Sequence, residues 1–133
     1  MFKQIQTLAV VALALSGCVS DYKKVDGKPF YGTTPAFTAW DQKKKDGLIP
    51  VSISCRMPQS GPAAYAPKGT TVSTKWAKAP PNVKWVEFFT GPQSDVEPER
   101  VHARSLGARK ISGGSFYQTV SKQRIYCEIW RTD

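Results

Sequence analysis

The chain has 133 residues and a mass of 14.7 kDa, and 19 Lys and Arg against 10 Asp and Glu give it a formal net charge of +9. This length allows one ordinary domain or two very small ones and excludes a multidomain enzyme. A hydrophobic content of 41% excludes a disordered chain, and three cysteines are too few for a disulfide-dense scaffold.

Residues 1–18 have the pattern of a bacterial export leader. Lys3 supplies a positive start, and Leu8–Leu15 is an unbroken run of eight apolar residues. That run is too short to cross about 30 Å of hydrocarbon but is typical of a signal-peptide core. It ends in Leu15-Ser16-Gly17-Cys18, which resembles the lipobox of bacterial lipoproteins. The alternatives are an ordinary secretory leader with a chance cysteine and an uncleaved anchor.

The resemblance implies cleavage before Cys18 and a covalent lipid, palmitate included, on its thiol. Two or three acyl chains hold a protein on a membrane almost permanently, whereas one chain holds it only marginally. Val19 follows the cysteine, which by analogy with enteric sorting favours the outer membrane over the outer face of the plasma membrane. We therefore expect a periplasm-facing envelope lipoprotein with no cofactor beyond this lipid and no nucleic-acid partner.

The cysteine count agrees with export. If the lipid occupies Cys18, one pair remains, Cys55 and Cys127. Each alternates with apolar residues in a strand pattern, so each thiol faces the core. In an oxidising compartment this predicts a structural disulfide. Two free buried thiols and a reactive thiol are the alternatives.

We predict a leader over residues 1–17, a lipidated tether over 18–33 and one small domain over 34–133. The domain opens with a helix over 34–47, which Thr34 caps and Gly47 ends. Phe37 and Trp40 lie one turn apart and form its buried face.

A second helix is predicted over 94–107, with Ser94 and Glu97 as a capping box and Gly107 as its stop, although Pro98 counts against it. Pro-rich residues 57–69 read as a loop, and Gly113-Gly114 as a hairpin turn. The predicted strands cover 48–56, 70–78, 83–90, 108–112, 115–120 and 124–130.

These elements predict an α+β fold, an antiparallel sheet with two helices on one face. Both predicted helices have the same spacing from cap to glycine, and two strands follow each. The glycines are 60 residues apart and the tryptophans Trp76 and Trp130 are 54 apart. One interpretation is a duplicated helix–strand–strand unit, since a single unit could not cover its own apolar face.

The chain offers little for catalysis. His102 is the only histidine, so a metal centre is not expected. Glu87 lies mid-strand, where burial would raise its pKa, but an ion pair with a lysine or arginine across the sheet is the better prediction. The C-terminal third is basic, and we predict contacts to an anionic partner from six of its cations: Arg100, Arg104, Arg109, Lys110, Lys122 and Arg124.

The expected function is therefore non-enzymatic. It is that of a binding or structural module for an anionic envelope component or an envelope protein complex. The alternative is an inhibitor of a hydrolase such as a peptidoglycan-cleaving enzyme, with residues 57–69 as its inhibitory loop. An enzyme would need a pocket around Glu87 with a second carboxylate.

Overall fold

The computed structural model describes residues 22–133, so Cys18 and the predicted leader lie outside it. Helix α2 covers Thr34–Lys45 and helix α3 covers Gln93–Ser105. Neither of these helices is long and apolar enough to cross a membrane. The strands are β1 (Tyr22–Val25), β2 (Lys28–Tyr31), β3 (Leu48–Arg56), β4 (Thr71–Lys78), β5 (Trp85–Pro92), β6 (Arg109–Gln118) and β7 (Gln123–Thr132).

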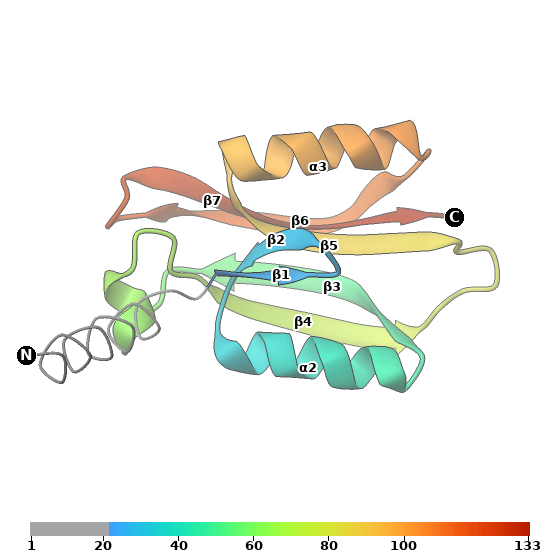
Figure 1. The fold of residues 1–133 in the computed structure, drawn as a ribbon, viewed down its shortest axis with the longest axis horizontal. Coiled ribbons are helices and arrows are strands. Elements are labelled where there is room, and N and C mark those ends of the chain that lie inside the picture. The colour runs from blue at the N-terminus through green and yellow to red at the C-terminus, as the bar shows by residue number, and fades with distance from the viewer. Residues whose placement is uncertain (1–21) are drawn as a thin grey trace, which may run out of the picture.

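The α+β class is confirmed, but the layering differs from the prediction. Three antiparallel sheets form, β1-β2, β3-β4 and β5-β7-β6, in place of one. Helix α3 covers one face of the three-stranded sheet, and the β3-β4 hairpin and α2 lie on its other side (Figure 1). The prediction of both helices on one face is wrong because β5 is apolar on both faces and each face needs cover. Phe88 packs toward α2, and its neighbour Phe89 packs toward α3.

The folded part begins earlier than residue 34. Residues 22–31, predicted as part of the tether, form the β1-β2 hairpin through a turn at Asp26-Gly27, where both φ angles are positive (51° and 79°). That dipeptide is a favoured two-residue hairpin turn. Phe30 of β2 is fully buried, with its ring 5.2 Å from that of Phe37 and 4.8 Å from that of Phe88. The hairpin is therefore part of the core.

Both helices end as predicted, at a glycine with positive φ, Gly47 (74°) and Gly107 (78°). Their starts differ. Thr33, one residue earlier than expected, is the N-cap of α2, and Pro92 is the N-cap of α3. The predicted capping box is wrong because Ser94 already lies inside the first turn, and Pro98 is accommodated within α3.

The predicted turn at Gly113-Gly114 is also wrong, because β6 runs through both glycines and the turn follows at residues 119–122. The glycines serve close packing. A Cβ on Gly114 would lie 3.6 Å from Sγ of Cys127 and 4.0 Å from the backbone nitrogen of Cys55. Small residues here let β3 cross over the sheet.

The two halves repeat the order strand–helix–strand–strand, as β2-α2-β3-β4 and β5-α3-β6-β7. The hairpin that follows each helix, β3-β4 or β6-β7, carries a shift of register at the same point. Pro50 pairs with Trp76 just before one shift of register, and Lys110 pairs with Trp130 just before the other. These positions keep the offsets of 60 and 54 seen in the sequence. The order of elements and the position of the irregularity therefore repeat, but the strand pairing does not, because β5 pairs with β7 whereas β2 pairs with β1.

Corresponding strands of the two halves also contact one another, β2 with β5 and β3 with β6. The backbone N–H of Ile53 donates to the hydroxyl of Ser112 at 3.0 Å, and the hydroxyl of Thr90 donates to the carbonyl of Tyr31 at 2.8 Å. Each half thus covers the apolar surface of the other.

Candidate functional site

The predicted cysteine pair is bonded in the structure. Cys55 of β3 and Cys127 of β7 form a disulfide with their Cα atoms 6.2 Å apart. Cys127 is fully buried in the main core. The bond joins the β3-β4 hairpin to the central strand of the three-stranded sheet, so it stabilises the contact between layers.

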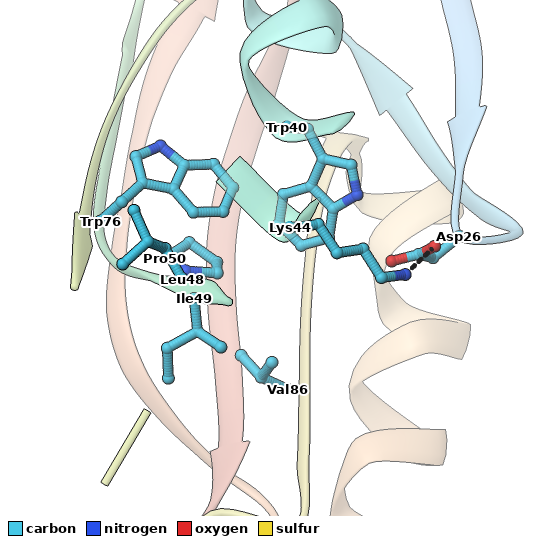
Figure 2. Close-up of a pocket in the computed structure, with 8 residues that line it drawn as sticks. All are labelled: Asp26, Trp40, Lys44, Leu48, Ile49, Pro50, Trp76 and Val86. Carbon is cyan, nitrogen blue, oxygen red and sulfur yellow. Dashed lines mark hydrogen bonds and ion pairs between the residues drawn. The ribbon is translucent and has the colours of Figure 1, made fainter. Parts of the chain in front are cut away.

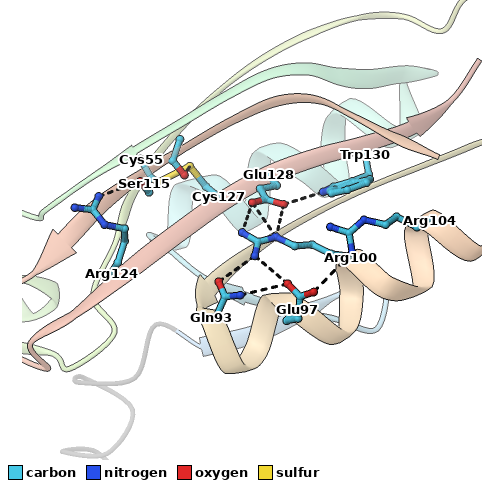
Figure 3. A network of polar contacts seen from close by, with 11 residues as sticks. Cys55, Gln93, Glu97, Arg100, Arg104, Ser115, Arg124, Cys127, Glu128 and Trp130 are labelled. Atoms are coloured by element: carbon cyan, nitrogen blue, oxygen red, sulfur yellow. Dashed lines mark hydrogen bonds and ion pairs between the residues drawn. A yellow bond between two sulfur atoms is a disulfide. The ribbon is translucent and has the colours of Figure 1, made fainter.

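Arg100, one of the six predicted contact residues, is held inside the molecule (Figure 3). Its guanidinium donates to both carboxylate oxygens of Glu128 and to one oxygen of Glu97. Trp130 Nε1 donates to Glu128 at 2.8 Å. Burial opposes ionisation of Glu128, but the hydrogen bonds from Arg100 and Trp130 outweigh it and hold the pKa of that carboxyl below its ordinary value. Arg100 serves the fold.

The other five predicted cations divide between two regions. Arg104 of α3 lies over the ring of Trp130 of β7, while Arg109 and Lys110 are exposed at the start of β6. Lys122 and Arg124 are exposed in the turn after β6 and at the start of β7. Since β6 is ten residues long, its two ends carry separate cation pairs. The six residues do not converge on one patch.

Lys122 and Arg124 share their end of the molecule with exposed apolar side chains. Tyr65 is 81% exposed, Tyr117 52% and Val120 42%. We call these five residues the loop end. The side-chain amide of Gln118 connects the loop between β3 and β4 to the turn after β6. It donates to the carbonyls of Ala66 (3.1 Å) and Gly69 (3.0 Å), and its oxygen accepts from the N–H of Val120.

The loop between β3 and β4 is ordered by packing. It contains a 3₁₀ turn over Pro62–Tyr65. Gly69 lies so close to this turn that a Cβ on it would be 1.8 Å from the carbonyl oxygen of Ala63. The disulfide fixes Cys55 just before this loop begins, so the loop holds Tyr65 in a defined position.

The described chain starts at this same end. Tyr22 of β1 pairs with Tyr31 of β2, and the ammonium of Lys68 donates to the Tyr31 phenol at 3.0 Å and to Asp95 at 3.3 Å. The hydrogen bond to Tyr31, against the cost of burial, raises the pKa of Lys68. The chain therefore enters the domain beside the loop that carries Tyr65 (Figure 1).

The opposite end holds an apolar pocket of about 130 Å³, which we call the distal pocket. It lies where α2 ends, β3 begins and β4 ends, beside the β1-β2 turn (Figure 2). Its lining residues are Asp26, Trp40, Lys44, Leu48, Ile49, Pro50, Trp76 and Val86.

Contact between two tryptophan rings fixes the walls of the distal pocket. The ring centroids of Trp40 and Trp76 are 5.0 Å apart, and Trp76 Nε1 donates to the hydroxyl of Thr74 at 2.8 Å. At the mouth, Lys44 and Asp26 form an exposed ion pair of 2.7 Å. The sequence pattern predicts Trp40 in the core and Asp26 in the tether, and no local pattern brings these two residues together.

Glu87 makes an ion pair with a lysine as predicted, but the partner lies in β2 and not across the sheet that contains Glu87. Its side chain is 5% exposed and lies 3.4 Å from the ammonium of Lys28, which is also 2.9 Å from Glu99. Burial, with repulsion from Glu99, raises the pKa of Glu87 to about 7 against the attraction of Lys28. A second carboxylate is thus near, but Lys28 contacts both acids and neutralises part of their charge.

Residues 22–133 show no group of three His, Cys, Asp or Glu side chains that could hold a metal ion. His102 is exposed, with its ring 6.2 Å from that of Trp85. No family model, curated protein or solved structure matches the chain.

Proposed function

We propose that the protein is a lipid-anchored envelope protein that works as a non-enzymatic binding module, and that the distal pocket is its binding site. The lipobox pattern at Cys18 and the disulfide of Cys55 with Cys127 both support export. The anchor is a diacylglyceryl group, and the outer membrane is its expected place, with the outer face of the plasma membrane as the alternative.

The position of the distal pocket carries the proposal. The pocket lies at the end of the domain away from the start of β1, where the tether from Cys18 enters. A protein anchored through that tether presents the pocket to the periplasm. Binding surfaces that are concave, mostly apolar and edged by a few polar groups are typical of ligand sites.

The pocket's size and charge indicate its ligand. A cavity near 150 Å³ holds one benzene-sized group, so about 130 Å³ suits one apolar side chain. Lys44 and Lys45 are exposed beside it. The ligand is therefore an apolar side chain of an envelope protein, with an acidic residue next to it. On binding, Lys44 leaves its ion pair with Asp26 and forms one with that acidic residue.

The test is crosslinking in intact envelopes, followed by affinity capture of the lipidated protein. We expect one stoichiometric partner with the wild type and its loss with Lys44→Glu. Lys75→Glu makes the same charge change at an exposed lysine of β4 that does not line the pocket, and should keep the partner. Recovery of lipid alone, or equal recovery with Lys44→Glu, contradicts the binding site.

The anchor has its own test. Radiolabelled palmitate should enter the protein in growing bacteria and should not enter Cys18→Ser. Absence of label in the wild type, or equal label in the variant, contradicts the proposed location, whatever the crosslinking shows.

The ordered loop with exposed Tyr65 favours the hydrolase inhibitor as a second candidate. A rigid projecting loop loses little entropy when it enters an active-site cleft. An inhibitor of this kind slows clearing of a peptidoglycan suspension by a lysozyme-type hydrolase, and Tyr65→Ala relieves the inhibition. Unchanged clearing with the wild type excludes it for that class of enzyme.

A further inference from the structure

We propose that the loop end contacts the anionic phospholipid headgroups of the leaflet that holds the lipid anchor. The proposal rests on the proposed anchor at Cys18 and adds a second, non-covalent contact. It assigns a role to Tyr65, Tyr117, Val120, Lys122 and Arg124, which lie far from the distal pocket.

The length of chain between anchor and domain is the first argument. Cys18 and Tyr22 are four residues apart, and a fully extended chain spans at most about 3.6 Å per residue, or about 14 Å here. Tyr22 pairs with Tyr31, whose phenol contacts Lys68 of the loop that carries Tyr65. The anchor therefore keeps this end of the domain close to the headgroups.

The chemistry of the loop end is the second argument. Tyrosine is enriched where membrane meets water, because its ring is apolar and its hydroxyl polar. Neither segment that builds the loop end, 57–69 or 115–124, contains an Asp or Glu. Asp95 of α3 lies at the same end but is paired with Lys68 at 3.3 Å, whereas Asp26 and Asp41 lie around the distal pocket.

The acid-free segments leave Lys122 and Arg124 available to phosphates. Both are exposed, and the guanidinium of Arg124 donates to the neutral hydroxyl of Ser115 at 3.0 Å. Each cation near an anionic membrane surface strengthens binding about fivefold. With the loop end on the bilayer, the domain stands with α2's C-terminal end and the distal pocket directed away from it.

Vesicle binding tests the contact without the anchor. The mature chain with Cys18→Ser contains all of residues 22–133 and is mixed with vesicles of phosphatidylcholine alone or with added phosphatidylglycerol, and the bound fraction is measured by sedimentation. We expect preferential binding to the vesicles with phosphatidylglycerol. Lys122→Gln with Arg124→Gln should lower that binding about 25-fold, and Tyr65→Ser should lower it on both kinds of vesicle.

The matched control is Arg109→Gln with Lys110→Gln, which removes the same charge from the opposite end of β6. Charges there are farther from the bilayer than the screening length of about 10 Å at moderate salt, so binding should fall less than twofold. An equal loss with the control pair, or equal binding to both vesicles, overturns the proposal. Because Cys18 is absent from this experiment, its result is independent of palmitate labelling, and either proposal can fail alone.

Discussion

Arg100 and Glu128 form a nearly buried ion pair between α3 and the central strand of the sheet, with side chains 12% and 2% exposed. Glu128 lies on the face of β7 opposite to Cys127, so the same strand is tied to α3 by charge and to β3 by a disulfide. The strand is thus fixed on both sides by specific bonds as well as by apolar packing.

Arg100→Met should destabilise the protein by about 3–5 kcal/mol, because it leaves the carboxylate of Glu128 buried without its cation. Adding Glu128→Met should restore most of the loss, since a well-packed apolar pair replaces a buried ion pair at little cost. Urea denaturation measures both. Arg104→Met, one turn further along α3 at a side chain that is 56% exposed, is the control and should cost under about 1 kcal/mol. Equal losses of unfolding free energy for Arg100→Met and Arg104→Met would show that the ion pair of Arg100 with Glu128 adds nothing specific to stability.

Glu87 should make stability fall as pH rises from about 4.5 to 7. Its folded pKa of about 7 lies above the ordinary 4.5 because of burial, so the folded state binds more protons than the unfolded state in this window. Below about pH 4.5 the carboxyl of Glu87 is protonated in both states, so the free-energy cost of burying its charge is absent. Above about pH 7 this cost is fully present, and it amounts to at most roughly 3 kcal/mol.

The measurement is the difference in unfolding free energy between wild type and Glu87→Gln across this range. We expect the unfolding free energy of Glu87→Gln to rise relative to that of the wild type as pH rises, since glutamine carries no charge to desolvate. Glu97→Gln, at a carboxylate that is 44% exposed, serves as the comparison. A difference that stays constant with pH would mean that Glu87 titrates normally.

The disulfide should contribute up to about 4 kcal/mol, because it closes a long loop between residues 72 apart. Cys55→Ala with Cys127→Ala removes the cross-link while keeping both positions small and apolar. Thermal and urea unfolding give the change. Thiol labelling of the denatured, lipidated protein should find no free cysteine before reduction and two after it; labelling before reduction would contradict the bond.

Gly69→Ala should loosen the loop that carries Tyr65. The new Cβ would overlap the carbonyl of Ala63, so the backbone must move and the two hydrogen bonds from Gln118 lose their acceptors. An unsatisfied buried amide costs about 1–3 kcal/mol.

Limited proteolysis between residues 57 and 69 reports this loosening. Ser60→Ala changes an exposed position of the same loop and should cost under about 0.5 kcal/mol. Similar cleavage rates for the two variants would show that Gly69 does not hold the loop.

Local patterns predicted much of the secondary structure. Gly47 and Gly107 end their helices as expected because positive φ is a property of single residues. Phe37 and Trp40 are buried as their spacing indicates. The predicted turn at Gly113-Gly114 is wrong because a glycine pair also permits close packing, and only the crossing of β3 shows which use applies.

The sequence by itself indicated the class of elements, their repeated order and the pairing of Cys55 with Cys127, since each follows from periodicity or from a count of residues. Only the tertiary structure decided that Arg100 is internal while Lys122 and Arg124 are exposed beside Tyr65. It also decided that Asp26 and Trp76 share a pocket. Side chains far apart in the chain meet through the packing of whole layers, and no local pattern encodes that packing.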